Sequence, residues 1–286
     1  LIFFFGLLLT AVLHARRVPG SLLWGIAGST LLAIGLRTAL PRLPELAESP
    51  IVRESLLMTR FAIADAVVSR APSVEPLAFQ MDLVGALDVA MLPFIVIFLF
   101  MVLFDTVGTL IGVGQQAGEL RDNKLPRARQ AMLSDAVGTV AGACLGTSTV
   151  TSFIESAAGV EQGGRTGLTS LTTAGLFLFA PFFSPLIAMV GSYPPIVAPA
   201  LVLVGAMMMH SVTRVEWDDP SEAIPAFLTL IGIPLSYSIA DGLALGLISY
   251  PIIKLLSGRR RDVNVLMVVL AVLLVAYFVL LRSRVG

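Results

Sequence analysis

The chain has 286 residues, of which 56% are hydrophobic and 13% charged, with zero net charge and a mean hydropathy of +0.90. These values exclude an ordinary soluble protein, and repeated apolar runs predict an all-α polytopic membrane protein in contact with the lipid bilayer. Zero net charge gives no sign of the basic surface that a nucleic-acid-binding protein has. One cysteine, Cys144, and two histidines exclude an internal disulfide framework and a Cys/His metal cluster, so we expect no metal and no cofactor.

The chain opens with two apolar segments, Leu1–Leu13 and Ser21–Leu36, joined by a turn that carries Arg16 and Arg17. Each has the composition of a membrane helix or of the end of one. Leu1 stands inside the first apolar run and is not a methionine. We therefore expect the chain to begin partway through a larger transporter.

Residues 37–88 break this pattern with prolines and with evenly mixed acidic and basic side chains. Such a composition is typical of a linker outside the membrane. Within it, Glu54–Ser69 would also suit one amphipathic helix lying along the membrane surface. The sequence leaves both interpretations open.

Further apolar runs predict the remaining helices. The run from Ala223 to Leu256 is too long for one crossing of a bilayer, so we predict two helices that meet near Ala240. With that split, the basic loops fall on one side, which the positive-inside rule assigns to the cytoplasm. The other predicted segments are Val89–Ala117, Ala131–Gly146, Thr166–Val190 with a break at Pro181 and Pro185, Ile196–Met209 and Val263–Leu281.

One stretch departs from the apolar pattern: Gly146–Glu155, with the sequence GTSTVTSFIE. Its β-branched residues predict a short strand over Thr147–Thr151. Ser152 and Glu155 have the spacing of a capping box and predict a helix start. Extended backbone inside a membrane needs protein or a water-filled cavity around it, and a half-helix that begins in such a cavity is a common transporter site. A capping box at an ordinary surface turn is the alternative.

Asp105 and Asp135 lie inside apolar segments, and Glu155 lies at a predicted helix start that apolar sequence flanks. An acid at the centre of a membrane helix costs about 3 kcal/mol on insertion scales, so it usually faces a cavity and has a role. Two carboxylates that face one cavity could hydrogen-bond the N–H edges of a planar heterocycle and share a coupling proton. A bond between helices is the alternative for Asp105, and helix capping or a pair with Arg127 or Arg129 is the alternative for Asp135.

Five short motifs are distinctive: Phe104–Gly112 (FDTVGTLIG), Thr147–Gly159 (TSTVTSFIESAAG), Gly164–Thr169, Trp217–Asp219 and Glu222–Thr229. Together they resemble the AzgA-type purine permeases of the nucleobase–ascorbate transporter superfamily. The resemblance implies an inverted-repeat (7+7) fold with a core domain, which contains a short strand and a half-helix, and a gate domain. The chain would hold about the last nine segments and one extra. Because the partner of the strand would lie in an earlier segment, we expect that this chain does not transport alone.

The resemblance also implies a division of the chain into parts. Residues 1–36 would be the last two gate helices of the first repeat, and 37–88 the linker. Residues 89–190 would be the core domain of the second repeat, and 191–257 its gate helices. Residues 258–286 would form a basic loop and an extra membrane helix, for which we have no functional account.

The same resemblance implies the site. Asp105 and Glu155 match the acidic substrate-binding positions, and Phe153 and Ile154 match residues that line the substrate. Thr109 stands where some relatives carry a proton-linked His or Asp, so the coupling role shifts toward Asp105. Two further residues are expected to take part in coupling or to support the site: Asp135 and Ser156.

The function implied by the resemblance is symport of a purine nucleobase with a proton or sodium ion, by alternating access, in the multi-pass setting of the cell membrane. Adenine, guanine and hypoxanthine are not distinguished, and a homodimer formed through the gate domain is left open. An anion carrier of the sulfate or bicarbonate type with the same broad fold is the alternative, as is a truncated, inactive product. An enzyme is not expected, because the sequence offers no nucleophile–base pair or metal set.

Overall fold

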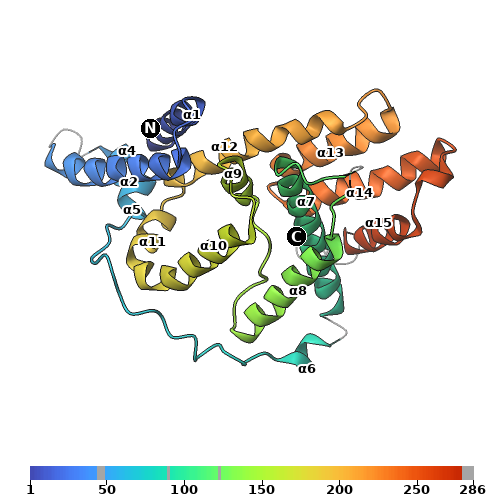
Figure 1. Ribbon diagram of the computed structural model, residues 1–286, viewed down its shortest axis with the longest axis horizontal. Helices are drawn as coiled ribbons and strands as arrows, with labels where there is room; N and C mark the ends of the chain where they lie inside the picture. The colour runs from blue at the N-terminus through green and yellow to red at the C-terminus, as the bar shows by residue number, and fades with distance from the viewer. Residues whose placement is uncertain (44–48, 89–90, 122–123, 279–286) are drawn as a thin grey trace. The chain divides into compact units, whose positions relative to one another are not determined.

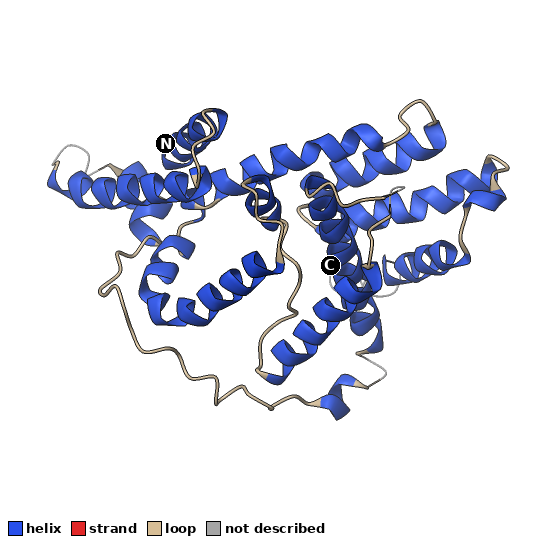
Figure 2. Ribbon diagram, in the orientation of Figure 1, coloured by secondary structure: helices blue, strands red, loops and turns tan. Residues whose placement is uncertain are grey.

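A computed structural model describes residues 1–43, 49–88, 91–121 and 124–278 of the chain. Within these ranges the secondary structure is helical and contains no strand (Figure 2). The predicted segments Val89–Ala117 and Val263–Leu281 each extend partly outside the described residues. By internal contacts the chain forms two compact units: residues 1–80 with 109–208, and residues 81–108 with 209–286.

The first unit holds most of the shorter helices, which Figure 1 shows from blue to yellow. Its helices are α1 (Ile2–Ala15), α2 (Ser21–Ala39), α4 (Pro50–Arg53), α5 (Leu56–Thr59), the end of α7 (Leu92–Gln116), α8 (Ala128–Cys144), α9 (Ser156–Glu161), α10 (Gly167–Phe179), α11 (Ser184–Gly191) and α12 (Ala198–Met208). The predicted break near Pro181 and Pro185 is confirmed, because a 3₁₀ turn at Ala180–Phe183 separates α10 from α11.

Helices α1 and α2 pack closely because small residues on each face larger ones on the other. A Cβ built on Gly6 would collide with the Ser29 hydroxyl, and one built on Gly25 would collide with the Thr10 hydroxyl. Thr10 is buried and donates its hydroxyl hydrogen to the Gly6 carbonyl of its own helix at 2.6 Å. Small residues at a crossing let two membrane helices approach, which is the packing expected of a membrane domain.

The linker does not form the amphipathic helix considered for Glu54–Ser69, and its residues up to 80 belong to the first unit. The short helices α4 and α5 form instead, and only α5 lies within Glu54–Ser69. Phe61 follows them and is buried in an apolar cluster with Tyr193 and Ile196. A longer helix would compete with that burial and with the backbone bond from Ser69 N–H to the Phe182 carbonyl, at 2.8 Å.

The second unit is built on an antiparallel helical hairpin. Its elements are α6 (Leu83–Ala86), the first part of α7, α13 (Pro220–Ser236), α14 (Ile239–Leu256) and α15 (Val265–Tyr277). The predicted division of the run at 223–256 into two helices is confirmed, with the break at Tyr237 and Ser238 instead of Ala240. Tyr237 has a positive φ of 52°, and the Ser238 hydroxyl accepts a hydrogen bond from the Asp241 N–H, which together end one helix and start the next.

Close packing joins the two helices of the hairpin. A Cβ built on Gly242 would lie 2.8 Å from Cα of Ile233, and one built on Gly246 would lie 3.0 Å from the Pro225 carbonyl oxygen. Glycine at these positions therefore allows the two backbones to approach.

Three helical stretches among the described residues are long and apolar enough to cross a membrane: Ser21–Arg42, Gly167–Gly191 and Ile239–Leu256. Shorter apolar helices lie at Ile2–Ala15 and Val265–Ala276. The chain is therefore an α-helical membrane protein with apolar helices in both units.

Candidate functional site

One face of α8 binds the stretch Gly146–Glu155, which carries part of the predicted site. The Asp135 carboxylate accepts hydrogen bonds from Ser152, at 3.0 Å from the backbone N–H and at 3.1 Å from the hydroxyl. One turn further along α8, the Thr139 hydroxyl donates to the Val150 carbonyl at 2.7 Å. Because residues four apart on a helix share a face, these bonds hold the stretch along the length of α8.

Gly142 continues the same face by one more turn. A Cβ built there would lie 2.7 Å from Val150 Cγ2 and 2.8 Å from Thr147 Oγ1. The stretch thus approaches α8 where α8 has no side chain. Residues Asp135, Thr139 and Gly142 together form what we call the α8 cradle.

The predicted strand over Thr147–Thr151 is wrong. Residues 147–153 form neither a helix nor a strand. The β-branched residues there favour an extended backbone, but a strand also needs a partner strand, and the described residues provide none. Side chains of the α8 cradle bind this backbone in place of a β ladder.

The predicted capping box is also wrong. Helix α9 begins at Ser156, its N-cap position is Glu155, and the Glu155 side chain makes no capping hydrogen bond. Ser152 lies one turn too early to cap this helix, and its hydroxyl is bound to Asp135. The Glu155 carboxylate is consequently exposed and is not used in capping.

The two apolar residues before Glu155 are held differently from each other. The Phe153 ring is 59% exposed and stacks on Phe177 of α10, with ring centroids 6.5 Å apart and planes inclined by 22°. Ile154 is half-buried, and its Cδ1 atom lies 3.8 Å from the position that a Cβ on Gly112 of α7 would occupy. Phe153 and Glu155 are thus both exposed and two positions apart, and an aromatic ring and a carboxylate are groups that can receive a planar, hydrogen-bonding molecule.

The structure does not test all of the predicted site. Asp105 is exposed on α7 in the second unit, whereas Glu155 is exposed in the first unit. A cavity shared by the two acids therefore stays a prediction. Thr109 is buried, with 5% of its surface exposed, and Ser156 is exposed at the first position of α9. Asp135 accepts hydrogen bonds from Ser152, whereas helix capping and a pair with Arg127 or Arg129 stay predictions.

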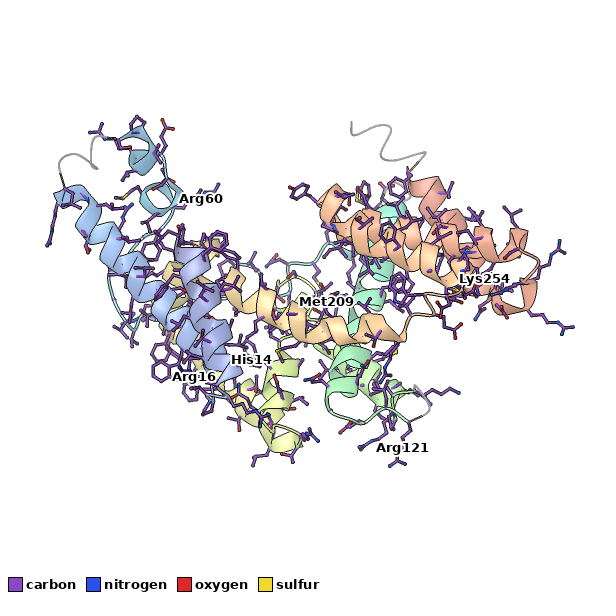
Figure 3. All side chains as sticks on the ribbon, turned by 90° about the horizontal axis from the view of Figure 1, so that it is seen from above. His14, Arg16, Arg60, Arg121, Met209 and Lys254 are labelled. Carbon is purple, nitrogen blue, oxygen red and sulfur yellow. The ribbon has the colours of Figure 1, made fainter. Side chains whose placement is uncertain are left out.

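The far end of α9 contacts the turn between α1 and α2. His14 Nε2 lies 3.7 Å from Glu161 Oε1, and the Gly20 N–H donates to Gln162 Oε1 at 3.2 Å. Figure 3 shows His14 near the end of α1, close to Arg16. The short helix that follows Glu155 is thus held at both ends, by α8 through Ser152 and by the α1–α2 turn.

Comparison with known proteins identifies the family. Residues 1–245 match the model of the permease family that includes the xanthine and uracil permeases. The chain belongs to this permease family. The membership expected from the motifs is confirmed, and the protein is a multi-pass protein of the cell membrane.

Several curated relatives of the permease are similar over much of its length. A protein of Methanocaldococcus jannaschii that is named as a permease is 44% identical over 280 residues, which cover 98% of this chain and 59% of the relative. The guanine/hypoxanthine permease PbuO of Bacillus subtilis is 39% identical over 273 residues, or 94% of this chain and 58% of the relative. The adenine permease AdeQ of Escherichia coli is 46% identical over 208 residues, or 72% and 46%. The chain spans about three-fifths of the length of the first two relatives.

Two residues of the permease's α8 cradle were not among the predicted site residues. Thr139 and Gly142 stand four and seven positions after Asp135, so a stripe of Asp, Thr and Gly runs along one helical face. That spacing could have predicted a polar face on this helix. It could not have predicted which residues bind to that face, because Ser152 is 17 residues away from Asp135.

Proposed function

We propose that the protein is a secondary active transporter of purine nucleobases, and that it couples uptake to a proton or sodium ion by alternating access. Relatives named for guanine, hypoxanthine and adenine support a purine substrate. The observation that carries the proposal is that Glu155 and Phe153 are both exposed, two positions apart, at the end of a stretch that the α8 cradle binds.

Each residue has a role that its chemistry supports. The Glu155 carboxylate accepts hydrogen bonds from N–H groups on the edge of the purine, and Phe153 covers the face of the ring, since aromatic pairs prefer offset stacking. Asp105 supplies the second carboxylate and carries the coupling proton. Ile154 closes an apolar side of the site, and Thr109 and Ser156 contribute hydroxyl groups near the two acids.

A cation-coupled mechanism follows from the charges of the proposed site. Two carboxylates near one neutral purine repel each other unless a proton or sodium ion offsets one of them. Binding of the cation would then favour binding of the purine, and the reverse, because linkage between two sites is reciprocal. An anion carrier would not place two acids at its substrate site, since anion sites use the N-terminal ends of half-helices.

Uptake of radiolabelled hypoxanthine, guanine and adenine into cells that lack their own purine permeases tests the proposal. Cells that express the protein from its complete gene should accumulate at least one of these purines, and dissipation of the proton or sodium gradient should abolish accumulation. Glu155→Ala should abolish uptake, and Glu155→Gln should retain a small part of it. Glu75→Gln, an exposed acid of the linker, is the matched control. Absence of uptake of any purine at normal membrane expression, or full uptake by Glu155→Ala, would refute the assignment.

A further inference from the structure

A groove in the second unit lies outside the proposed purine site. It has a volume of about 450 Å³ and is lined by residues of α13, α14, α15 and the segment that precedes α13. The groove begins at the charged end of the α13–α14 hairpin, where Figure 3 labels Lys254. None of its lining residues belongs to the stretch that carries Glu155.

The polarity of the groove changes along the hairpin. Arg214, Glu216 and Glu222 line it at the charged end. Leu243 and Leu247 line it further along α14, where the helix is apolar enough to cross a membrane. A groove with charges at the membrane boundary and apolar walls toward the membrane interior fits an amphiphile with a charged head and a hydrocarbon tail.

Two carboxylates at the charged end have oxygens available for a ligand. Glu222 Oε1 accepts both the Lys254 ammonium, at 2.7 Å, and the Tyr250 hydroxyl, at 3.3 Å. Among the described residues, Glu222 Oε2 has no hydrogen bond or ion pair, and neither does the exposed Glu216 carboxylate. These oxygens would accept hydrogen bonds from an ammonium group, which are stronger than bonds between neutral groups.

Arg214 adds the opposite charge to the same end of the groove. A guanidinium has five N–H donors in a planar fork and suits a phosphate, even when some of those donors are already bound. Ammonium acceptors beside a phosphate donor complement a zwitterionic head in which the two charges are close together. A head with N–H groups is preferred over a trimethylated head, since the latter cannot donate hydrogen bonds to the carboxylates.

We infer that this groove binds a phospholipid with a primary ammonium head, such as phosphatidylethanolamine. The ammonium lies against Glu216 and Glu222, the phosphate against Arg214, and one acyl chain against Leu243 and Leu247. The site is independent of the proposed purine transport, and its occupancy is measured without a transport assay.

Native mass spectrometry of the protein tests the inference. The protein is expressed from its complete gene, purified in detergent, delipidated and incubated with equal amounts of phosphatidylethanolamine, phosphatidylcholine and phosphatidylglycerol. Phosphatidylethanolamine should be retained about tenfold better than phosphatidylcholine, as expected when hydrogen bonds to charged groups distinguish two ligands. Equal retention of these two lipids, or better retention of the anionic phosphatidylglycerol, would overturn the proposal.

Variants assign the preference to the groove. Glu216→Gln should reduce retention of phosphatidylethanolamine to the level of phosphatidylcholine, and Arg214→Gln should reduce retention of both lipids. Glu222→Gln should act as Glu216→Gln does, but it also removes a partner of Lys254. Glu216→Gln keeps the test decisive if Glu222→Gln fails to fold, because the Glu216 carboxylate makes no hydrogen bond or ion pair with the residues that the structure describes. A preference that persists in Glu216→Gln at the level of the Glu75→Gln control would show that the lipid binds elsewhere.

Discussion

Asp135 of α8 accepts two hydrogen bonds from Ser152 on the same carboxylate oxygen, from the backbone N–H at 3.0 Å and from the hydroxyl at 3.1 Å. This contact joins residues 17 positions apart in the sequence and fixes the backbone three residues before Glu155. A charged acceptor replaces the ladder partner that a strand would have supplied. Glu155 is the residue proposed to bind the purine. Its position therefore depends on the Asp135 carboxylate, which need not touch the purine itself.

Asp135→Ala is expected to reduce purine uptake strongly, because it leaves the Ser152 N–H without an acceptor. Hydrogen bonds to charged groups contribute about 1.5–3 kcal/mol each, so a loss of at least about tenfold in uptake efficiency is expected. Asp135→Asn should be milder, since its amide oxygen still accepts. Hypoxanthine uptake as a function of concentration measures both variants. Asp65→Ala and Asp65→Asn, in the exposed part of the linker, are matched controls, and wild-type uptake by Asp135→Ala would contradict the role of the cradle.

Gly142→Ala tests the close approach of the stretch to α8. The new Cβ would lie 2.7 Å from Val150 and 2.8 Å from Thr147, so the stretch must shift. Overpacking of this kind typically costs about 1–3 kcal/mol, and we expect lower uptake together with a lower unfolding temperature. Thermal unfolding followed by size-exclusion chromatography provides the second measurement. Gly175→Ala in α10, where a Cβ would meet nothing within 4 Å, should leave both properties unchanged or slightly improved.

The helices of this permease were largely predictable from the sequence because apolar runs fix their positions. The division of α13 from α14 and the break between α10 and α11 followed from span length and from proline chemistry, which act locally. The boundary at Tyr237 was missed by a few residues, since a non-glycine residue with positive φ leaves no clear sequence signal.

The site was less predictable because its geometry depends on contacts between distant residues. Thr147–Thr151 has the composition of a strand, and Ser152 with Glu155 has the spacing of a capping box. In the structure, hydrogen bonds with Asp135 and Thr139 of α8 replace the strand and the capping box that these local patterns predict. The same holds for Phe61, whose burial against Tyr193 prevents the local helix that the surrounding residues would allow.

The lowered pKa of Asp219 predicts how the stability of the second unit depends on pH. Hydrogen bonds from the backbone N–H and the hydroxyl of Ser221, together with the nearby Arg259, lower the pKa of Asp219 from its ordinary value of 3.8 to about 2. A carboxyl group with a lowered folded-state pKa stabilises the fold above its ordinary pKa, and this contribution is lost as the pH falls through the lowered value. The window therefore runs from about pH 4 down to about pH 2.

Asp219→Asn is the variant that tests this window. Asparagine is a good N-cap residue and keeps the hydrogen bonds from Ser221, but it loses the ion pair with Arg259. The wild-type protein should unfold at a higher temperature than Asp219→Asn above pH 4, and the difference should shrink as the pH falls toward 2. Unfolding temperatures of both proteins in detergent across this range provide the measurement. A difference that stays constant down to pH 2 would show that the carboxylate charge is not involved.

Lys254 joins the acidic groups at the charged end of the α13–α14 hairpin. Its side chain is 3% exposed, and its ammonium lies 2.7 Å from Glu222, 3.8 Å from Asp219 and 3.9 Å from Asp262. Lys254→Met would keep the apolar length of the side chain and remove a charge that these three carboxylates share. We expect a fall in the unfolding temperature, because Glu222 loses its ion pair with a buried ammonium, while Asp219 keeps its pair with Arg259.

Two further variants distinguish this effect from a general effect of charge removal. Lys124→Met changes an exposed lysine that bonds Arg121 through the backbone, and it should leave the unfolding temperature unchanged. Combining Lys254→Met with Glu222→Gln removes one of the unpaired charges and should recover part of the lost stability, because residues in one network do not act additively. If the double variant unfolds at a lower temperature than Lys254→Met, repulsion among the carboxylates is not the cause of the loss. The contact of the lysine ammonium with the Tyr250 ring, 5.5 Å from the ring centroid, is then the interaction that the variant removes.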